Sequence, residues 1–209
     1  MSKRLVDLGL SAVLLIALAP VLAAVAVAVA TTGPVLYGGE RVGLGGRRFR
    51  MWKFRTMVVG ADRLGGSSTA SDDARLTGLG RWLRRFKADE LPQLWNVLVG
   101  DMSFVGPRPQ VPWAVERYSD EERILLTVRP GITDPASLRF SNEGEILRGH
   151  PDPDRAYFEL IHPEKMRLSI DYVRSRTLAG DLRLIAATVG AALGRAPARP
   201  GAGPVSRPS

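Results

Sequence analysis

The longest apolar stretch of the chain lies near its N-terminus, where no charged residue occurs between Leu8 and Ala30. As an α-helix, this stretch would be roughly 34 Å long at about 1.5 Å per residue, enough to cross a bilayer core of about 30 Å. A cleaved signal peptide would also place Lys3 and Arg4 before an apolar run, but this run is longer than the usual signal core. The two main alternatives are a straight span and a hairpin that returns to the side it entered.

Two features of this stretch favour the hairpin. Pro20 lies near its middle, where the missing amide proton and the clash with the preceding turn predict a break in the helix. Both flanks are also basic, and positive charge tends to stay on the cytoplasmic side. The flanking basic residues are Lys3 and Arg4 before the stretch and Arg41, Arg47, Arg48, Arg50, Lys53 and Arg55 after it. We therefore predict a re-entrant helix–break–helix anchor in residues 1–34.

The pattern after the anchor predicts a compact, mainly helical α+β domain in residues 35–193. Alternating apolar and basic positions in Glu40–Met57 predict one or two short strands with a turn at Gly45–Gly46. Residues 60–73 are rich in Gly, Ser, Thr and Asp, which predicts a loop. Residues 194–209 have almost nothing to bury and are predicted to be a disordered tail.

Apolar residues at helical spacing predict the helices of this domain. Residues 79–86 form a helix with one apolar and one cationic face, and Leu91–Val99 form a second helix that Gly100 ends. Further helices are expected after the capping box Ser119–Glu122, from Asp152-Pro153, over Pro163–Arg176 and over Asp181–Leu193. Amphipathic helices of this kind can lie in a membrane surface.

Charge and composition indicate an anionic partner. The 209 residues include 29 Lys and Arg against 21 Asp and Glu, a net charge of +8. This balance suits nucleic acid, phospholipid head groups or a phosphorylated substrate, and does not choose among them. The chain has no cysteine, which excludes disulfides and thiolate metal sites. His150 and His162 lack metal-ligand spacing, so a zinc site is not expected.

The segment Lys87–Pro109 carries the candidate chemistry. Asp89 and Glu90 lie directly before a predicted helix and close to several cations, although helix-dipole complementarity would explain such acids in any protein. Arg108 lies between two prolines that restrict the backbone. A rigidly held guanidinium suits paired hydrogen bonds to phosphate, while a solvated arginine in a proline-rich turn is the simpler alternative.

Taken whole, this segment resembles the signature of the small monotopic phosphoglycosyl transferases, also called the bacterial sugar transferase family. Other family motifs are matched in the same order by Pro20, Lys53–Met57, Gly80–Arg84 and Val128–Thr133. The similarity runs from about Lys3 to about Leu193 and resembles the short form of the family. The chain departs from the pattern at Ala19, where many relatives have serine, and at residues 134–137, where many have Gly and later Gln.

The resemblance implies transfer of a phosphosugar from a UDP-sugar to a polyprenyl phosphate, commonly undecaprenyl phosphate, with release of UMP. Such a step begins the assembly of a bacterial surface glycan or glycoconjugate. The resemblance further implies that Asp89 is the nucleophile and forms a phosphosugar–aspartyl intermediate, which splits one difficult displacement into two. It also implies bound Mg²⁺, with Glu90 and Asp89 as the metal-binding residues.

The same resemblance assigns phosphate binding to Arg84 and Arg108. Lys53 and Arg55 are weaker candidates, because basic residues after a membrane segment often contact lipid head groups instead. The location implied is the bacterial cytoplasmic membrane, with the catalytic domain on its cytoplasmic face and no nucleic-acid partner. A homodimer is compatible with the sequence, which identifies neither the sugar nor the glycan.

Two alternatives stay open from the sequence. A membrane-tethered basic module that binds anionic lipid or nucleic acid would explain the charge and the apolar stretch, but not the ordered motifs. A transferase could also act by direct attack of the acceptor, without a covalent intermediate. Asp171 and Asp181 are further candidates for the site, although each also suits an exposed helical position.

Overall fold

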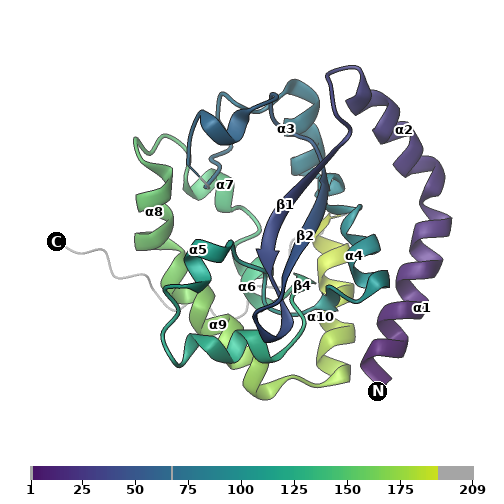
Figure 1. Ribbon diagram of the computed structural model, residues 1–209, viewed down its shortest axis with the longest axis vertical. Helices are drawn as coiled ribbons and strands as arrows, with labels where there is room; N and C mark the ends of the chain where they lie inside the picture. Colours follow the sequence, from purple (N-terminus) through teal and green to yellow (C-terminus); the bar gives the residue numbers. More distant parts are fainter. Residues whose placement is uncertain (1, 67, 193–209) are drawn as a thin grey trace.

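Two N-terminal helices, α1 (Ser2–Ala17) and α2 (Ala19–Ala30), run along one side of the protein in the computed structural model, which describes residues 2–66 and 68–192 (Figure 1). They meet at Leu18 at a bend of 63°. Pro20 lies in the first turn of α2, and it has no amide proton with which to continue the hydrogen bonding of α1. The predicted helix–break–helix is confirmed.

Membrane-spanning capacity is confined to this bent pair. Within the described ranges no single helix is long and apolar enough to cross a bilayer, whereas α1 and α2 together meet that test by length and composition. Large apolar side chains on this pair are exposed, among them Val13, Ile16 and Val27. Leu182 and Val189 of the last helix, α10 (Leu178–Ala192), are exposed as well. These side chains are available for contact with lipid.

The first two strands form an antiparallel hairpin that crosses the middle of the view in Figure 1. Strand β1 (Leu36–Val42) pairs with β2 (Arg48–Phe54), so that Leu36 lies opposite Phe54. The connecting turn contains the 3₁₀ segment η1 (Leu44–Gly46), in which Gly45 has φ 65° and Gly46 has φ 80°. Glycine suits these left-handed conformations, and the predicted strands and turn are confirmed.

The segment with the candidate chemistry folds as helix, 3₁₀ turn and helix. Helix α3 (Gly78–Arg85) is followed by η3 (Ala88–Glu90) and α4 (Gln93–Val99). Lys87, between α3 and η3, has φ 56° and is the one non-glycine residue with positive φ in the described ranges. Such a backbone is sparsely populated for a residue with a Cβ atom. The two predicted helices are confirmed, with Asp89 and Glu90 in the tight turn between them.

A short parallel pairing, which the sequence pattern did not predict, joins β3 (Ser103–Val105) to β4 (Gly131–Thr133). The two chains come so close that a Cβ atom on Gly131 would lie 2.1 Å from the amide nitrogen of Gly106. Only glycine permits this approach. It fixes the start of the segment that leads from β3 to Arg108.

Most remaining elements are short helices. They are η2 (Ala61–Arg63), α5 (Pro112–Val115), η4 (Glu122–Thr127), α6 (Pro135–Arg139), α7 (Glu143–Ile146), α8 (Pro153–Leu160) and α9 (His162–Ser175). The capping box forms as predicted, since the Ser119 amide donates to Glu122 Oε2 at 2.7 Å. The prediction of an α-helix after it is wrong, because a 3₁₀ helix forms instead. The backbone becomes extended at Val128, two residues before Pro130. The predicted tail at 194–209 lies outside the described residues.

The main core joins the bent helix pair to the rest of the protein. Its buried side chains come from β2, α4, β3, η4 and α9, and include Met51, Val97, Phe104, Leu125 and Ile170. Partly buried leucines of α1, Leu10 and Leu14, pack against this core, as do Leu184 and Ile185 of α10. Near the end of α2, Val29 packs with Phe54 and Leu83. Both ends of the bent pair therefore contact one mainly helical α+β fold.

Candidate active site

A buried ion cluster forms around Glu90. Lys53, from β2, donates to Glu90 Oε1 at 3.1 Å. Arg108, from the segment after β3, donates to both carboxylate oxygens, to Oε2 at 3.2 Å and to Oε1 at closer range. Residues from three separate parts of the chain thus meet at one carboxylate, which accepts the paired hydrogen bonds typical of arginine.

The charged side chains of this cluster shift one another's pKa values. Burial alone would raise the pKa of Glu90, but Arg108 and Lys53 outweigh it and hold that pKa far below its usual range. Burial lowers the pKa of Lys53, an effect that Glu90 opposes. The attraction of Glu90 raises the pKa of Arg108. Glu90 is therefore held as an anion, and its charge favours the cationic form of both partners.

Asp89 lies in a different environment although it is the adjacent residue. Its exposed fraction is 4%, and its Oδ1 atom has no hydrogen-bond partner in the described part of the chain. Burial raises the pKa of Asp89, opposed by the positive charges of Lys53 and Arg84 and reinforced by the negative charge of Glu90. A desolvated carboxylate with few hydrogen bonds is better suited to attack an electrophile than to hold a structure together.

Arg84 approaches the cluster from α3. Its Nε atom donates to Thr56 Oγ1 at 3.2 Å, and its charge acts on Asp89 and Glu90. Burial lowers the pKa of Arg84, an effect that the nearby carboxylates oppose. Among the residues that the structure describes, no carboxylate is hydrogen-bonded to the Arg84 guanidinium as Glu90 is to Arg108. Arg84 is therefore the cation of the cluster that is most available to a phosphate.

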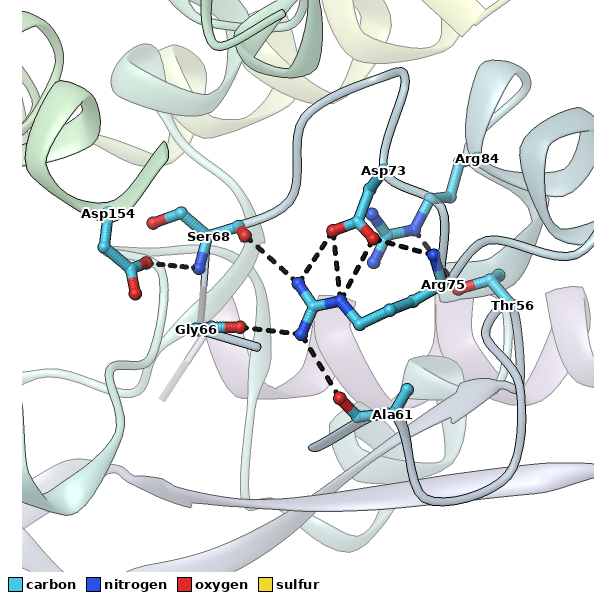
Figure 2. A network of polar contacts seen from close by, with 8 residues as sticks. All are labelled: Thr56, Ala61, Gly66, Ser68, Asp73, Arg75, Arg84 and Asp154. Atoms are coloured by element: carbon cyan, nitrogen blue, oxygen red, sulfur yellow. Dashed lines mark hydrogen bonds and ion pairs between the residues drawn. The ribbon is translucent and has the colours of Figure 1, made fainter. Parts of the chain in front are cut away.

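The loop at residues 60–73 is tied down beside Arg84, as Figure 2 shows. Arg75 pairs with Asp73 at 2.7 Å and also donates into the loop. The accepting carbonyl oxygens belong to Ala61, Gly66 and Ser68, at 3.3, 3.0 and 3.5 Å. At the far side of the loop, Asp154 accepts from the Ser68 amide at 2.7 Å. This network holds the loop next to the cationic cluster.

Arg55, a predicted phosphate-binding residue, is not brought into the cluster. Its guanidinium donates to the carbonyl oxygens of Pro34 and Met57 at 2.6 and 2.9 Å, and to Thr32 Oγ1 at 2.9 Å. These bonds hold the chain where it leaves α2. Because Arg55 follows the last residue of β2, it does not share the strand geometry that points Lys53 at Glu90.

The two further acidic candidates also have other partners. Asp171 is exposed on α9 and pairs with Arg167 at 3.1 Å. Asp181 is buried on α10, where it accepts from Lys3 at 2.5 Å and from the Tyr172 hydroxyl at 2.8 Å. Asp181 therefore links the start of α1 to helices α9 and α10. The main influences on the pKa of Asp89 are burial and the charges of Lys53, Glu90, Arg84 and Lys87, and include neither carboxylate.

One residue at the site escaped the sequence reasoning. Gln93 is fully buried at the start of α4, and neither polar atom of its side chain has a hydrogen-bond partner in the described residues. The available signal was its position four residues after Asp89, little more than one helical turn away.

The residues present fit a magnesium ion that the substrate completes. Residues 2–66 and 68–192 contain no group of three or more His, Asp or Glu side chains able to hold a metal by itself. Mg²⁺ commonly uses one or two carboxylates together with water and substrate phosphates. Glu90 Oε2 accepts from Arg108 alone and keeps a lone pair, and Asp89 Oδ1 has no partner.

Comparison with known proteins places this geometry in context. The sequence matches the family described as bacterial sugar transferase over residues 1–195. It is 40% identical over 150 residues to a putative undecaprenyl-phosphate N-acetylgalactosaminyl 1-phosphate transferase of Bacillus subtilis (strain 168), covering 68% of this chain and 80% of that protein. It is 38% identical over 202 residues to an undecaprenyl-phosphate glucose phosphotransferase of Komagataeibacter xylinus, covering 90% of this chain.

The share of each relative that is matched differs widely. The chain spans 35% of the Komagataeibacter protein. It spans 68% of a UDP-glucose:undecaprenyl-phosphate glucose-1-phosphate transferase of Caulobacter vibrioides, to which it is 38% identical over 192 residues. All three names include undecaprenyl phosphate; two of them name glucose and the third names N-acetylgalactosamine.

Proposed function

Because the chain belongs to the bacterial sugar transferase family, we propose that it transfers a sugar 1-phosphate from a UDP-sugar to undecaprenyl phosphate and releases UMP. This step would begin the synthesis of a surface polysaccharide. The observation that carries the proposal is the buried, poorly hydrogen-bonded Asp89 beside Lys53, Arg84 and Arg108. The names of the relatives support the donor and the acceptor.

In the first step, an oxygen of Asp89 attacks the sugar-side phosphorus of the UDP-sugar. The bond from that phosphorus to the bridging oxygen breaks, and UMP leaves with the electron pair. An anionic nucleophile is repelled by a diphosphate, and the fixed charges of Arg84, Arg108 and Lys53 offset this repulsion. Glu90 keeps Arg108 and Lys53 in place for that purpose.

In the second step, a phosphate oxygen of undecaprenyl phosphate attacks the same phosphorus. The bond to Asp89 breaks, the carboxylate is regenerated, and the product is an undecaprenyl diphosphate sugar. Two displacements at one phosphorus allow one set of cations to serve both. Direct attack of the acceptor on the UDP-sugar is the alternative, and it would need no bond to Asp89.

Mg²⁺ belongs to this proposal as a cofactor held by Glu90, with Asp89 as a second metal-binding residue. When bound, it would neutralise charge on the diphosphate. The chain itself supplies few ligands, so metal and nucleotide sugar are expected to bind together.

We propose further that α1 and α2 enter and leave the membrane on the cytoplasmic face. At the start of α1, Arg4 donates to the carbonyl oxygens of Val97 and Leu98 at 2.6 and 2.8 Å. At the end of α2, Val29 is buried against Phe54. A straight span would have to separate one of these ends from the domain, whereas a re-entrant pair keeps both.

Cysteine labelling checks this topology, since the chain has no cysteine of its own. In membrane vesicles of known orientation, Ser2→Cys and Thr31→Cys are expected to react with an impermeant maleimide from the cytoplasmic side only. Labelling of the two positions from opposite sides would establish a straight span and contradict the re-entrant anchor.

Release of UMP tests the proposed reaction. With Mg²⁺ and undecaprenyl phosphate present, purified protein is expected to release UMP over many turnovers from at least one of UDP-glucose, UDP-galactose and the two UDP-N-acetylhexosamines. Without undecaprenyl phosphate, release should stop at no more than one UMP per protein molecule. The product should be extractable as a lipid-linked sugar. Protein that binds vesicles but releases no UMP from any donor in a wide panel would favour the non-catalytic basic module.

A further inference from the structure

Unpaired polar atoms are concentrated at the proposed nucleophile. In the described residues, the buried side-chain atoms without a hydrogen-bond partner are Ser71 Oγ, Asp89 Oδ1, Gln93 Oε1 and Gln93 Nε2. Three of these four atoms belong to two residues of one helical segment. Burying such a group unpaired costs free energy, so native proteins retain few of them. This concentration calls for a functional explanation.

A neighbouring amide gives the contrast. Asn96 lies almost one turn further along α4 and is equally buried. Its Nδ2 atom donates to the Arg50 carbonyl oxygen at 2.8 Å, and its Oδ1 atom accepts from the Trp52 amide at 3.0 Å. Both sides of this amide are thus used to fix β2 against α4. Gln93 fixes no other element by a hydrogen bond, so its polarity has no such structural use.

The backbone places Gln93 about one turn after Asp89. Leu91 (φ −53°, ψ −36°) and Pro92 (φ −60°, ψ −18°) continue a helical course from η3 into α4. The backbone amides of Leu91 and Leu94 donate to the carbonyl oxygens three residues back, as in a 3₁₀ helix, so Gln93 follows Asp89 by little more than one tight turn. The unpaired amide and the unpaired carboxylate oxygen therefore belong to successive turns of one buried segment.

We propose that Gln93 is a positioning residue for Asp89, whose Oδ1 accepts a hydrogen bond from the Gln93 side-chain amide when the UDP-sugar is bound. The inference rests on the proposed function. The bond would hold the carboxylate so that its other oxygen faces the phosphorus. Oδ1 becomes the carbonyl oxygen of the aspartyl phosphate and can keep the same donor, so the bond serves both displacements.

A neutral donor has a specific advantage at this position. An arginine or lysine hydrogen-bonded to Asp89 would stabilise the carboxylate anion strongly and weaken its attack. An amide fixes orientation with a smaller stabilisation of the charge. Orientation itself is valuable, because a displacement of about 1 Å at a reacting group can cost about 100-fold in rate.

Gln93→Met tests the inference because it keeps the size of the side chain and removes both unpaired polar atoms. The melting temperature is expected to stay level or rise, since no hydrogen bond within the protein is lost. The kcat for UMP release is expected to fall about 100-fold. The KM for the UDP-sugar should change less than about threefold, because Gln93 acts through Asp89 and contacts no substrate.

Two further variants make the result decisive. Gln93→Glu has nearly the same shape but, when ionised, accepts without donating, so it should be as slow as Gln93→Met. Asn96→Leu is the matched structural control and should lower the melting temperature, because it leaves the Arg50 carbonyl and the Trp52 amide unpaired.

Wild-type kcat in Gln93→Met would overturn the inference, and so would a loss of kcat that parallels a loss of melting temperature. Both outcomes presuppose active wild-type protein. Wild-type protein that releases no UMP would instead overturn the proposed function itself.

Discussion

Asp89→Asn is expected to lower the rate of UMP release by at least about 10⁴-fold, the scale of loss seen when a covalent nucleophile is removed. The amide cannot form the phosphosugar ester, so the first displacement has no attacking group. Wild-type protein quenched during turnover should carry an added hexose phosphate on the peptide that contains Asp89, and the variant should carry none. The measurements are UMP release and peptide mass spectrometry.

Folding and membrane binding should survive this substitution. Asp89 Oδ1 makes no hydrogen bond in the described structure, so the protein loses little when the charge is removed. Asp171→Asn is the matched control, since that carboxylate is exposed and paired only with Arg167 on the same helix; its rate should change less than about twofold. Near-normal turnover by Asp89→Asn would exclude the covalent route and favour direct attack.

Glu90→Ala should produce the second large effect, because it should lower both the free energy of unfolding and the rate of turnover. Arg108 and Lys53 would remain in a buried site without their shared anion. Removing one partner of a buried ion pair typically costs about 3–5 kcal/mol. The free energy of unfolding, measured by denaturant titration, should fall by an amount in this range.

The same variant should respond unusually to phosphate-containing ligands. UDP can supply the missing negative charge to Arg108 and Lys53, so it should raise the melting temperature of Glu90→Ala more than that of wild type. Turnover should stay at least about 100-fold low, because the cations are no longer held in the productive geometry. Glu145→Ala, which removes an exposed pair with Arg148, should cost about 1 kcal/mol or less. Equal stabilisation of Glu90→Ala and wild type by UDP would argue against phosphate binding at this cluster.

Features encoded within a few residues were predictable from the sequence. The apolar stretch interrupted by Pro20 predicted the bent helix pair, and Gly45–Gly46 predicted the turn of the hairpin. The capping box at Ser119 formed, although the helix after it is 3₁₀. Each of these depends on local backbone sterics and on hydrogen bonds between near neighbours, which the order of residues specifies directly.

The partners of individual charged side chains were decided by tertiary packing. Lys53 and Arg55 are two residues apart and equally basic, yet Lys53 binds Glu90 and Arg55 holds the chain after α2. Asp181 pairs with Lys3 from the opposite end of the chain. The parallel contact of β3 with β4 sets the start of the segment that carries Arg108.

The sequence by itself thus determined the bent helix pair, the adjacent acids and the arginine between two prolines, because those depend on local chemistry. Only the folded protein decided which cations act on Asp89 and that, in the described residues, the buried Gln93 side chain has no hydrogen-bond partner. Such pairings depend on which surfaces of distant elements pack together, and no short stretch of sequence contains that information.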